Sequence, residues 1–209
     1  RTKNKFMLIT KPDELDAEQL RANSIQKLFF PHWSYKIPAA IYEAFECIIF
    51  HMTDLPYGRG GSPLQNLIVH GHQDTVITAL RCVAAFDAGP VYLKRPLNLN
   101  GSAEEIFLRA DRIIESMIVT LIEERPTPVP QQGEPTVFQR RRPEQGDWTT
   151  AIDLDTVFDY IRMLDATGYP PAFIDVGPFR LSFSRASRRA DAVLADVRIS
   201  LRDTREETK

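Results

Sequence analysis

The sequence predicts an α/β fold with a mainly parallel sheet, and three observations lead to that prediction. Short apolar segments alternate with segments of helical pattern through the first third of the chain, which is typical of a parallel sheet wrapped by helices. The 209 residues are 43% hydrophobic and carry a formal net charge of −2, as in a globular protein with its own core. The longest apolar run, residues 47–50, is far short of the roughly 20 residues that cross a bilayer.

Three strands are expected in the first part of the chain, because each is a short apolar run bounded by polar residues or proline. They are residues 6–9, 25–30 and 47–51. The segments between them, residues 14–20 and 37–44, have the pattern of short helices. This order of strand, helix, strand, helix and strand indicates parallel neighbours in one sheet.

The middle of the chain adds another short helix, two strands and a long helix. The pattern predicts the short helix at residues 64–69 and strands at 75–80 and 91–93, with turn residues between the strands. Ser102 and Glu105 have the spacing of a capping box, which predicts the start of the long helix. Its apolar residues recur at helical spacing: Ile106, Phe107, Ala110, Ile113, Ile114, Met117, Leu121 and Ile122.

A change of composition marks the C-terminal part of the chain. Residues 125–146 are rich in Pro, Gln, Gly and charge, so we expect a linker that crosses the surface. Arg140–Arg142, inside this linker, is a candidate phosphate-binding run. We therefore divide the chain into a core, residues 1–125, and a linker with a small C-terminal α+β part, residues 126–209.

Beyond the linker, the pattern predicts one helix and three short strands. The helix covers residues 153–166, and the strands cover residues 172–174, 179–183 and 193–200. The last strand alternates apolar and polar residues, as a half-exposed strand does. It is the candidate for pairing with a second copy in a homodimer.

Candidate chemistry gathers where the third strand ends. Ligands bind at the carboxyl ends of strands in open α/β sheets, and His51 stands at such an end. A glycine-rich loop, residues 57–63, follows and leads into a helix N-terminus, where backbone amides favour anionic groups. Asp87 is either a turn residue or a carboxylate that packs beside His51 and holds its tautomer. Such a pair suits general-base chemistry near neutral pH.

The other histidines and the cysteines point to less chemistry. His32 ends the preceding strand and is a second candidate for the same crevice. His70 and His72 follow a helix, where we expect exposed side chains, and no cysteine or carboxylate stands nearby at zinc-ligand spacing. Cys47 and Cys82 lie far apart and are expected to be reduced thiols of a cytoplasmic protein. No metal site is predicted.

A longer motif runs through the same region. A strand ends in His51 within residues 50–56, Gly and Pro follow in residues 59–63, and Asp-Ala-Gly-Pro stands at residues 87–90. This pattern resembles the formyltransferase family that uses 10-formyltetrahydrofolate. The family includes methionyl-tRNA formyltransferases and sugar N-formyltransferases, and this chain resembles the sugar N-formyltransferases most. The resemblance extends over about residues 25–175. It implies a reduced Rossmann-like formyltransferase core, because few residues precede the second strand.

The resemblance implies a mechanism and the residues that carry it. A neutral primary amine attacks the formyl carbon, His51 accepts its proton or stabilises the oxyanion, and Asp87 orients His51. The family's catalytic asparagine falls on Ile49, which donates no hydrogen bond. The candidates to replace it are Thr53, Gln65, Asn66 and a backbone amide. We take Thr53 as the third catalytic residue, and a homologue that binds folate without catalysis is an alternative.

The resemblance also implies two ligand sites. The formyl donor is 10-formyltetrahydrofolate, with no metal. Its binding residues are expected to be Trp33, Ser34, Tyr35, Ile37, Pro38, Leu55, Val83, Ala84 and Phe86. The acceptor is expected to contact Tyr57, Arg59, Gly60, Gln65 and Asn66.

The predicted acceptor is the primary amine of an amino-deoxy sugar carried on a nucleotide. The stretch after residue 175 is shorter than the C-terminal barrel of tRNA-directed family members, and a near-zero net charge argues against a nucleic-acid partner. Another small amine, such as an amino acid or a peptide precursor, is the alternative. The predicted partners are thus a small molecule and a second copy of the chain, with no nucleic acid and no membrane.

Overall fold

The computed structural model of the protein describes residues 6–202, which form two compact units. The first unit contains the described residues up to Pro63 together with Thr75–Leu97 and Arg109–Phe138. The second contains Leu64–Asp74, Asn98–Leu108 and the described residues from Gln139 onward. Each unit is thus assembled from separate stretches of the chain, and the proposed division into domains at residue 125 stays a prediction.

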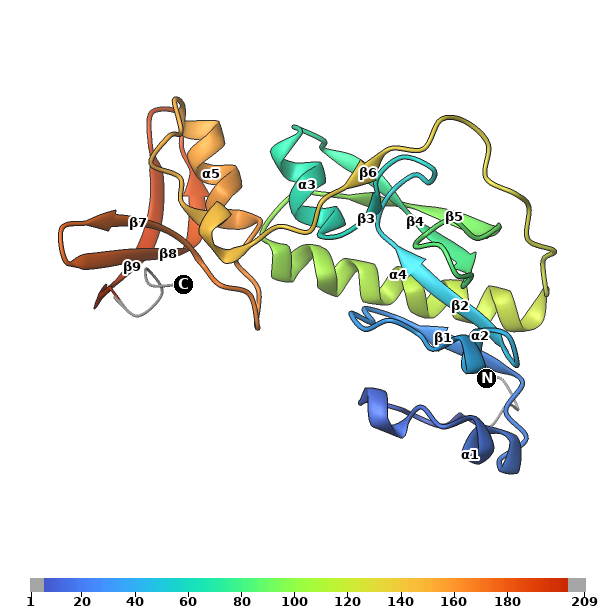
Figure 1. Ribbon diagram of the computed structural model, residues 1–209. Coiled ribbons are helices and arrows are strands. Elements are labelled where there is room, and N and C mark those ends of the chain that lie inside the picture. Colours follow the sequence, from blue (N-terminus) through green and yellow to red (C-terminus); the bar gives the residue numbers. More distant parts are fainter. Residues whose placement is uncertain (1–5, 203–209) are drawn as a thin grey trace. The chain divides into compact units, whose positions relative to one another are not determined.

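A four-stranded sheet organises the first unit, with the strand order β1-β2-β4-β5 (Figure 1). The strands are β1 (Lys27–Phe30), β2 (Glu46–His51), β4 (Asp74–Arg81) and β5 (Val91–Asn98). β1 and β2 are parallel, with Leu28 opposite Cys47, whereas β2 and β4 are antiparallel, with Ile48 opposite Arg81. The predicted α/β class is confirmed, and the sheet is mixed because β4 runs against β2.

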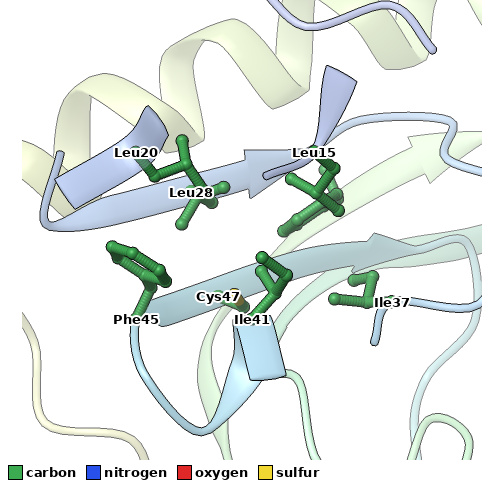
Figure 2. Close-up of a cluster of buried hydrophobic side chains, with 8 residues drawn as sticks. Leu15, Leu20, Leu28, Ile37, Ile41, Phe45 and Cys47 are labelled. Atoms are coloured by element: carbon green, nitrogen blue, oxygen red, sulfur yellow. The ribbon is translucent and has the colours of Figure 1, made fainter. Parts of the chain in front are cut away.

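Burial on both faces explains why β2 is an unbroken apolar run in the sequence. Cys47 and Ile48, which point to opposite faces of the strand, are both fully buried. Figure 2 shows a cluster of buried side chains around β1 and β2, to which α1 (Ala17–Ala22) and α2 (Ala39–Tyr42) contribute. The cluster consists of Leu15, Leu20, Leu28, Phe30, Ile37, Ile41, Phe45 and Cys47. This packing fixes the strand that ends at His51.

The strand predicted at residues 6–9 is not formed, so that prediction was wrong. Phe6 and Leu8 are 62% and 86% exposed, and the described chain has no regular secondary structure before η1 (Pro12–Glu14). A four-residue apolar run becomes a strand only where a neighbouring strand pairs with it. The sheet order instead begins at β1.

The long helix α4 (Ala103–Glu123) begins with the predicted capping box. The Ser102 N–H donates to Glu105 Oε2 at 2.8 Å, and the Glu105 N–H donates to Ser102 Oγ at 3.3 Å. The buried apolar residues follow the predicted helical spacing: Ile106, Ala110, Ile114, Met117 and Leu121. Within residues 6–202, none of the helices is both long and apolar enough to span a membrane.

The second unit contains a small antiparallel sheet with the order β7-β8-β9. Its strands are β7 (Ala172–Val176), β8 (Phe179–Arg188) and β9 (Val193–Leu201), and its helices include most of α3 (Pro63–Val69) and all of α5 (Leu154–Arg162). α5 packs mainly on β8. The buried Arg162 ends α5, where its side chain donates to Asp159 Oδ1 and to the Leu99 carbonyl, both at 2.6 Å. The helix is therefore shorter than the predicted span of 153–166.

Candidate active site

His51 stands at the last position of β2, with its ring held between a carbonyl and a carboxylate. Its side chain is only 9% exposed. Nε2 lies 2.8 Å from the Gly58 carbonyl oxygen, and because a carbonyl only accepts, Nε2 carries the proton and donates it. Nδ1 lies 3.6 Å from Asp87 Oδ1. The Gly58 carbonyl therefore sets the tautomer of the neutral ring and leaves Nδ1 toward the acid.

Asp87 reaches this position through an uncommon backbone conformation. Its φ is +51°, a left-handed geometry that aspartate tolerates better than most residues. Its Oδ2 accepts the Gly60 N–H at 2.8 Å, and its side chain is 13% exposed. The structure thus brings together the imidazole and the carboxylate that the sequence analysis paired. Their catalytic roles stay a prediction.

The third predicted catalytic residue, Thr53, lies beside the same carbonyl. It is fully buried, and its hydroxyl donates to the Gly58 oxygen at 3.3 Å. Its own carbonyl accepts the Thr78 hydroxyl at 2.7 Å. Gly58 has a φ of +72°, and a Cβ there would stand 2.7 Å from the Phe138 ring. Glycine is therefore required at the residue whose carbonyl meets both Thr53 and His51.

Residues 129–138, which we name the strap, are joined by hydrogen bonds to the segments around His51 and Asp87. Val129 exchanges two backbone hydrogen bonds of 2.8 Å with Val91. β6 (Val137–Phe138), within the strap, pairs in parallel with β3 (Arg59–Gly60). The expected surface linker is therefore bonded to other segments at Val129, Gln131 and residues 136–138. Composition rich in Pro, Gln and Gly excludes a long helix but does not exclude pairing with a distant segment.

The strap also supplies a side chain that the sequence analysis did not select. The Gln131 amide accepts two hydrogen bonds from Arg59, from Nε at 3.1 Å and from Nη2 at 2.7 Å. It donates to the carbonyls of Asp87 and Gly89 at 2.7 and 2.8 Å. No local pattern points to Gln131, because its role depends on contacts between three distant segments.

A lysine holds the other side of the loop that follows His51. Lys94 on β5 donates to the Leu55 carbonyl at 2.6 Å and forms an ion pair with Asp54. This residue was also absent from the predicted set. It fixes the chain between Thr53 and the glycine-rich turn.

The predicted folate residues have different environments in the structure. Ile37 and Leu55 are buried, at 7% and 2% exposure. Trp33 packs edge-on against Phe30 and Tyr35, with ring centroids 5.7 and 5.5 Å away. Val83 is half-buried, and the exposed members are Ser34, Tyr35, Pro38, Ala84 and Phe86.

The predicted acceptor residues are divided between the two units. Tyr57, Arg59 and Gly60 belong to the first unit, and the Tyr57 ring lies edge-on to Phe138 at 5.3 Å. Gln65 and Asn66 belong to the second unit, where they donate to the Met163 and Gln139 carbonyls at 3.2 and 3.0 Å. Ile49, at the position of the family's asparagine, packs against the core cluster around β1 and β2.

The other histidines make contacts away from His51. His32 Nε2 lies 2.7 Å from Asp111 Oδ1, so it pairs with a different carboxylate. His70 is exposed after α3, and His72 is half-buried there. No group of three or more metal-ligating side chains occurs in the described part of the chain.

Both cysteines are free thiols in surroundings that disfavour ionisation. Burial raises the pKa of Cys47 to about 12. Burial also raises the pKa of Cys82 above its ordinary value. Neither thiol is therefore set up as a nucleophile, because the thiolate is the reactive form.

Fold and site together define an α/β protein with an imidazole–carboxylate pair at the end of an inner strand, an arrangement suited to moving a proton. A family model described as "Methionyl-tRNA formyltransferase, C-terminal domain" matches residues 143–200. The solved structure "Methionyl-tRNA formyltransferase from Clostridium thermocellum" is 52% identical, with a TM-score of 0.90, over 92% of this chain and 86% of that chain. The chain belongs to the formyltransferase family, which uses formyl-tetrahydrofolate.

Two more relatives are less similar to this chain in sequence. The methionyl-tRNA formyltransferase of Gluconobacter oxydans (strain 621H) is 29% identical over 159 residues, which are 72% of this chain and 51% of the relative. The chain thus spans about half the length of the curated relatives it matches. A 4-N formyltransferase from Francisella tularensis is 14% identical with a TM-score of 0.65, covering 82% of this chain and 76% of that one. At that identity the likeness concerns the fold alone.

The predicted resemblance to formyltransferases is confirmed, but the predictions of a small-molecule acceptor and of no nucleic-acid partner were wrong. An amino-sugar acceptor with no nucleic-acid partner conflicts with the relatives at 52% and 29% identity, which are methionyl-tRNA formyltransferases. The prediction used the net charge of −2, which averages over the whole chain and does not describe any one surface. It also judged the C-terminal part too short, although residues 143–200 match a C-terminal-domain model.

Proposed function

We propose that this chain transfers the formyl group of 10-formyltetrahydrofolate to the α-amino group of methionyl-tRNA. The observation that carries the reaction is the buried approach of His51 Nδ1 to Asp87 Oδ1, at 3.6 Å, in a member of the formyltransferase family. The acceptor rests on the methionyl-tRNA formyltransferase relatives, the Clostridium thermocellum structure at 52% identity above all.

His51 takes the proton of the attacking amine at Nδ1. Its Nε2 proton is committed to the Gly58 carbonyl at 2.8 Å, so Nδ1 is the nitrogen that accepts. Once protonated, Nδ1 gains the Asp87 carboxylate as a partner, and this charge-assisted contact stabilises the imidazolium. The amine nitrogen bonds to the formyl carbon, the bond from that carbon to N10 breaks, and the proton passes to N10 of the leaving tetrahydrofolate.

The oxyanion of the tetrahedral intermediate needs a donor other than the Ile49 side chain. Four of the five backbone amides of residues 57–61 already donate to protein oxygens. The amide of Gly58 donates to no partner among residues 6–202, and it adjoins the loop carbonyl that holds His51. We assign it the role of oxyanion donor, and Thr53 holds the carbonyl of the same residue through its 3.3 Å hydrogen bond.

The ligands are proposed to bind the two predicted residue sets. The folate donor lies against the loop of residues 33–38 and the backbone of residues 83–86, where exposed aromatic and apolar groups support stacking. Arg59 contacts a phosphate of the acceptor. The match of residues 143–200 to a methionyl-tRNA formyltransferase C-terminal domain supports a tRNA contact in the second unit.

The test is formylation of methionyl-tRNA by the 209-residue chain with 10-formyltetrahydrofolate, followed by mass spectrometry of the released amino acid. We expect His51→Asn and Asp87→Asn to lower kcat/KM by roughly 10²–10⁴-fold, the range for losing a general base. His70→Asn, at an exposed histidine, is the matched control and keeps full activity. Formylation of a nucleotide-linked amino sugar, with methionyl-tRNA left unmodified, would refute the acceptor assignment.

A further inference from the structure

One side chain of the strap contacts both halves of the candidate site. Gln131 donates its two Nε2 hydrogens to the carbonyls of Asp87 and Gly89, at 2.7 and 2.8 Å. Its Oε1 accepts from two nitrogens of Arg59, at 3.1 and 2.7 Å. An amide has two donors and two acceptor positions on these atoms, so all four are used. Gln131 therefore links the segment that carries the acid to the loop that follows His51.

The chemistry of the four partners allows only one orientation of this amide. Both partners of Nε2 are carbonyls, which only accept, and both partners of Oε1 belong to a guanidinium, which only donates. A flipped amide would place its oxygen against two carbonyls and its NH₂ group against a cation. The Gln131 side chain is thus held in one orientation, and it restricts the positions of the Asp87 segment and of Arg59.

Asp87 needs such support because its backbone lies in the left-handed region. Its φ of +51° is less favourable than an extended or helical conformation for a residue with a Cβ. Beyond it, Gly89 lies so close to Arg81 that a Cβ would stand 1.8 Å from the Arg81 carbonyl oxygen. Gln131 holds the carbonyls on both sides of this tight turn. Without it, the turn that presents the carboxylate to His51 loses two hydrogen bonds.

Arg59 is a half-buried cation whose hydrogen-bond partner, the Gln131 side chain, is neutral. Among residues 6–202, none of the carboxylates forms an ion pair with Arg59. Its Nε and Nη2 are held by Gln131, and its Nη1 donates to none of the described residues. A guanidinium held along one edge in this way keeps its other edge available for an anion.

We propose that Gln131 is a positioning residue that holds Asp87 beside His51 and aims the Arg59 guanidinium at a phosphate of the acceptor. The second half of this proposal rests on the proposed function, because it needs an acceptor that carries phosphate. The first half concerns only the His51–Asp87 pair. Gln131 touches neither reacting atom, so it acts through these two residues.

Four variants separate the two halves of the proposal, the positioning of Asp87 and the aiming of Arg59. Gln131→Met keeps the length of the side chain and removes all four hydrogen bonds, and Gln131→Asn keeps an amide that is too short to span both partners. Arg59→Met removes the guanidinium and leaves Gln131 free to hold Asp87. Gln132→Met, at the exposed neighbouring glutamine, is the matched control.

Steady-state kinetics and ¹⁵N NMR of the His51 ring measure the two halves of the proposal separately. We expect Gln131→Met to lower kcat and to raise KM for methionyl-tRNA, each roughly tenfold, for the loss of paired hydrogen bonds. Arg59→Met raises that KM more than it lowers kcat. The ¹⁵N resonance of His51 Nδ1 moves in both Gln131 variants and stays in place in Arg59→Met and Gln132→Met.

The outcomes also separate this proposal from the proposed function. If the wild-type chain formylates no methionyl-tRNA, the Nδ1 resonance still tests the link from Gln131 to Asp87 and His51. Should Gln131→Met fail to fold, the same measurements on Gln131→Asn decide. A folded Gln131 variant whose Nδ1 resonance and kcat match those of Gln132→Met overturns the positioning role. An unchanged KM in Arg59→Met overturns the phosphate contact.

Discussion

His51 is held from two sides by groups that depend on left-handed backbone. Its Nε2 meets the carbonyl of Gly58, whose φ is +72°, and its Nδ1 faces Asp87, whose φ is +51°. Glycine adopts this conformation without cost, and aspartate pays a smaller penalty than a bulky residue does. The geometry of the site is therefore set by two peptide conformations as well as by side-chain packing.

Substitution of Gly58 tests this dependence. Gly58→Ala adds a Cβ 2.7 Å from Phe138 and 2.8 Å from Thr53 at positive φ, so we expect the free energy of unfolding to fall by about 2–4 kcal/mol, from strain together with overpacking. Gly71→Ala is the control, because Gly71 also has a positive φ, +78°, but a Cβ added there meets no atom within 4 Å. It should lose only about 1–2 kcal/mol, from the Cβ at positive φ alone. Urea denaturation measures both, and equal losses would contradict the crowding argument.

At the scale of helices and strands, local patterns predicted the elements whose signals lie within their own sequence. The capping box at Ser102 and the apolar spacing after it predicted α4, and burial on both faces of β2 explains its apolar run. β3 and β6, two residues each, had no such signal. Their pairing arises from tertiary contact between the strap and the loop after His51, which periodicity does not record.

The residues of the candidate site likewise divide into those with a local sequence signal and those without one. His51 and Asp87 could be predicted because one ends an apolar strand and the other stands in a motif. Gln131 and Lys94 could not, because each acts through backbone carbonyls far away in the sequence, at Asp87 and Leu55. A residue that serves by holding a distant backbone has no local pattern of its own.

The cap of α5 makes a pH-dependent prediction at this scale. The Thr156 N–H donates to Asp153 Oδ1 at 2.7 Å, and this bond lowers the pKa of Asp153 below its ordinary value of 3.8. The stabilisation is therefore complete above 3.8 and disappears as the pH falls through the lower folded-state value. We expect Asp153→Ala to melt below the wild type at pH 7 and this difference to shrink in acid. The measurement is thermal unfolding across that range.

Asp153→Asn provides the control for this experiment. Asparagine caps a helix without a charge, so the melting temperature of this variant relative to Asp153→Ala should stay constant with pH. A wild-type advantage over Asp153→Ala that persists at the lowest pH would argue against the carboxylate as its source.

For the molecule as a whole, net charge was a poor guide to the partner. The chain balances 26 basic against 28 acidic residues, yet basic residues gather locally, as in Arg140–Arg142. Arg141 is engaged there, with Nη2 donating to the Gln145 carbonyl at 2.8 Å, while Arg140 and Arg142 are exposed. Recognition of a phosphate backbone depends on such local groups.

Neutralising the two exposed arginines tests their part in tRNA binding. We expect the double variant Arg140→Gln, Arg142→Gln to bind tRNA more weakly and to reduce the slope of log K against log salt by roughly one to two, as for the loss of two phosphate contacts. Filter binding at several salt concentrations measures the slope, and thermal unfolding should show no change. An unaltered slope would exclude these residues from the contact.

The strap affects when, during synthesis of the chain, the candidate site can be fully assembled. Synthesis proceeds from the N-terminus, so the histidine and the acid leave the ribosome well before residues 129–138, which join their two loops. A nascent polypeptide can build much of its sheet while its catalytic groups still lack that brace. Competence thus arrives only once the later segment has been made and has docked onto the earlier ones.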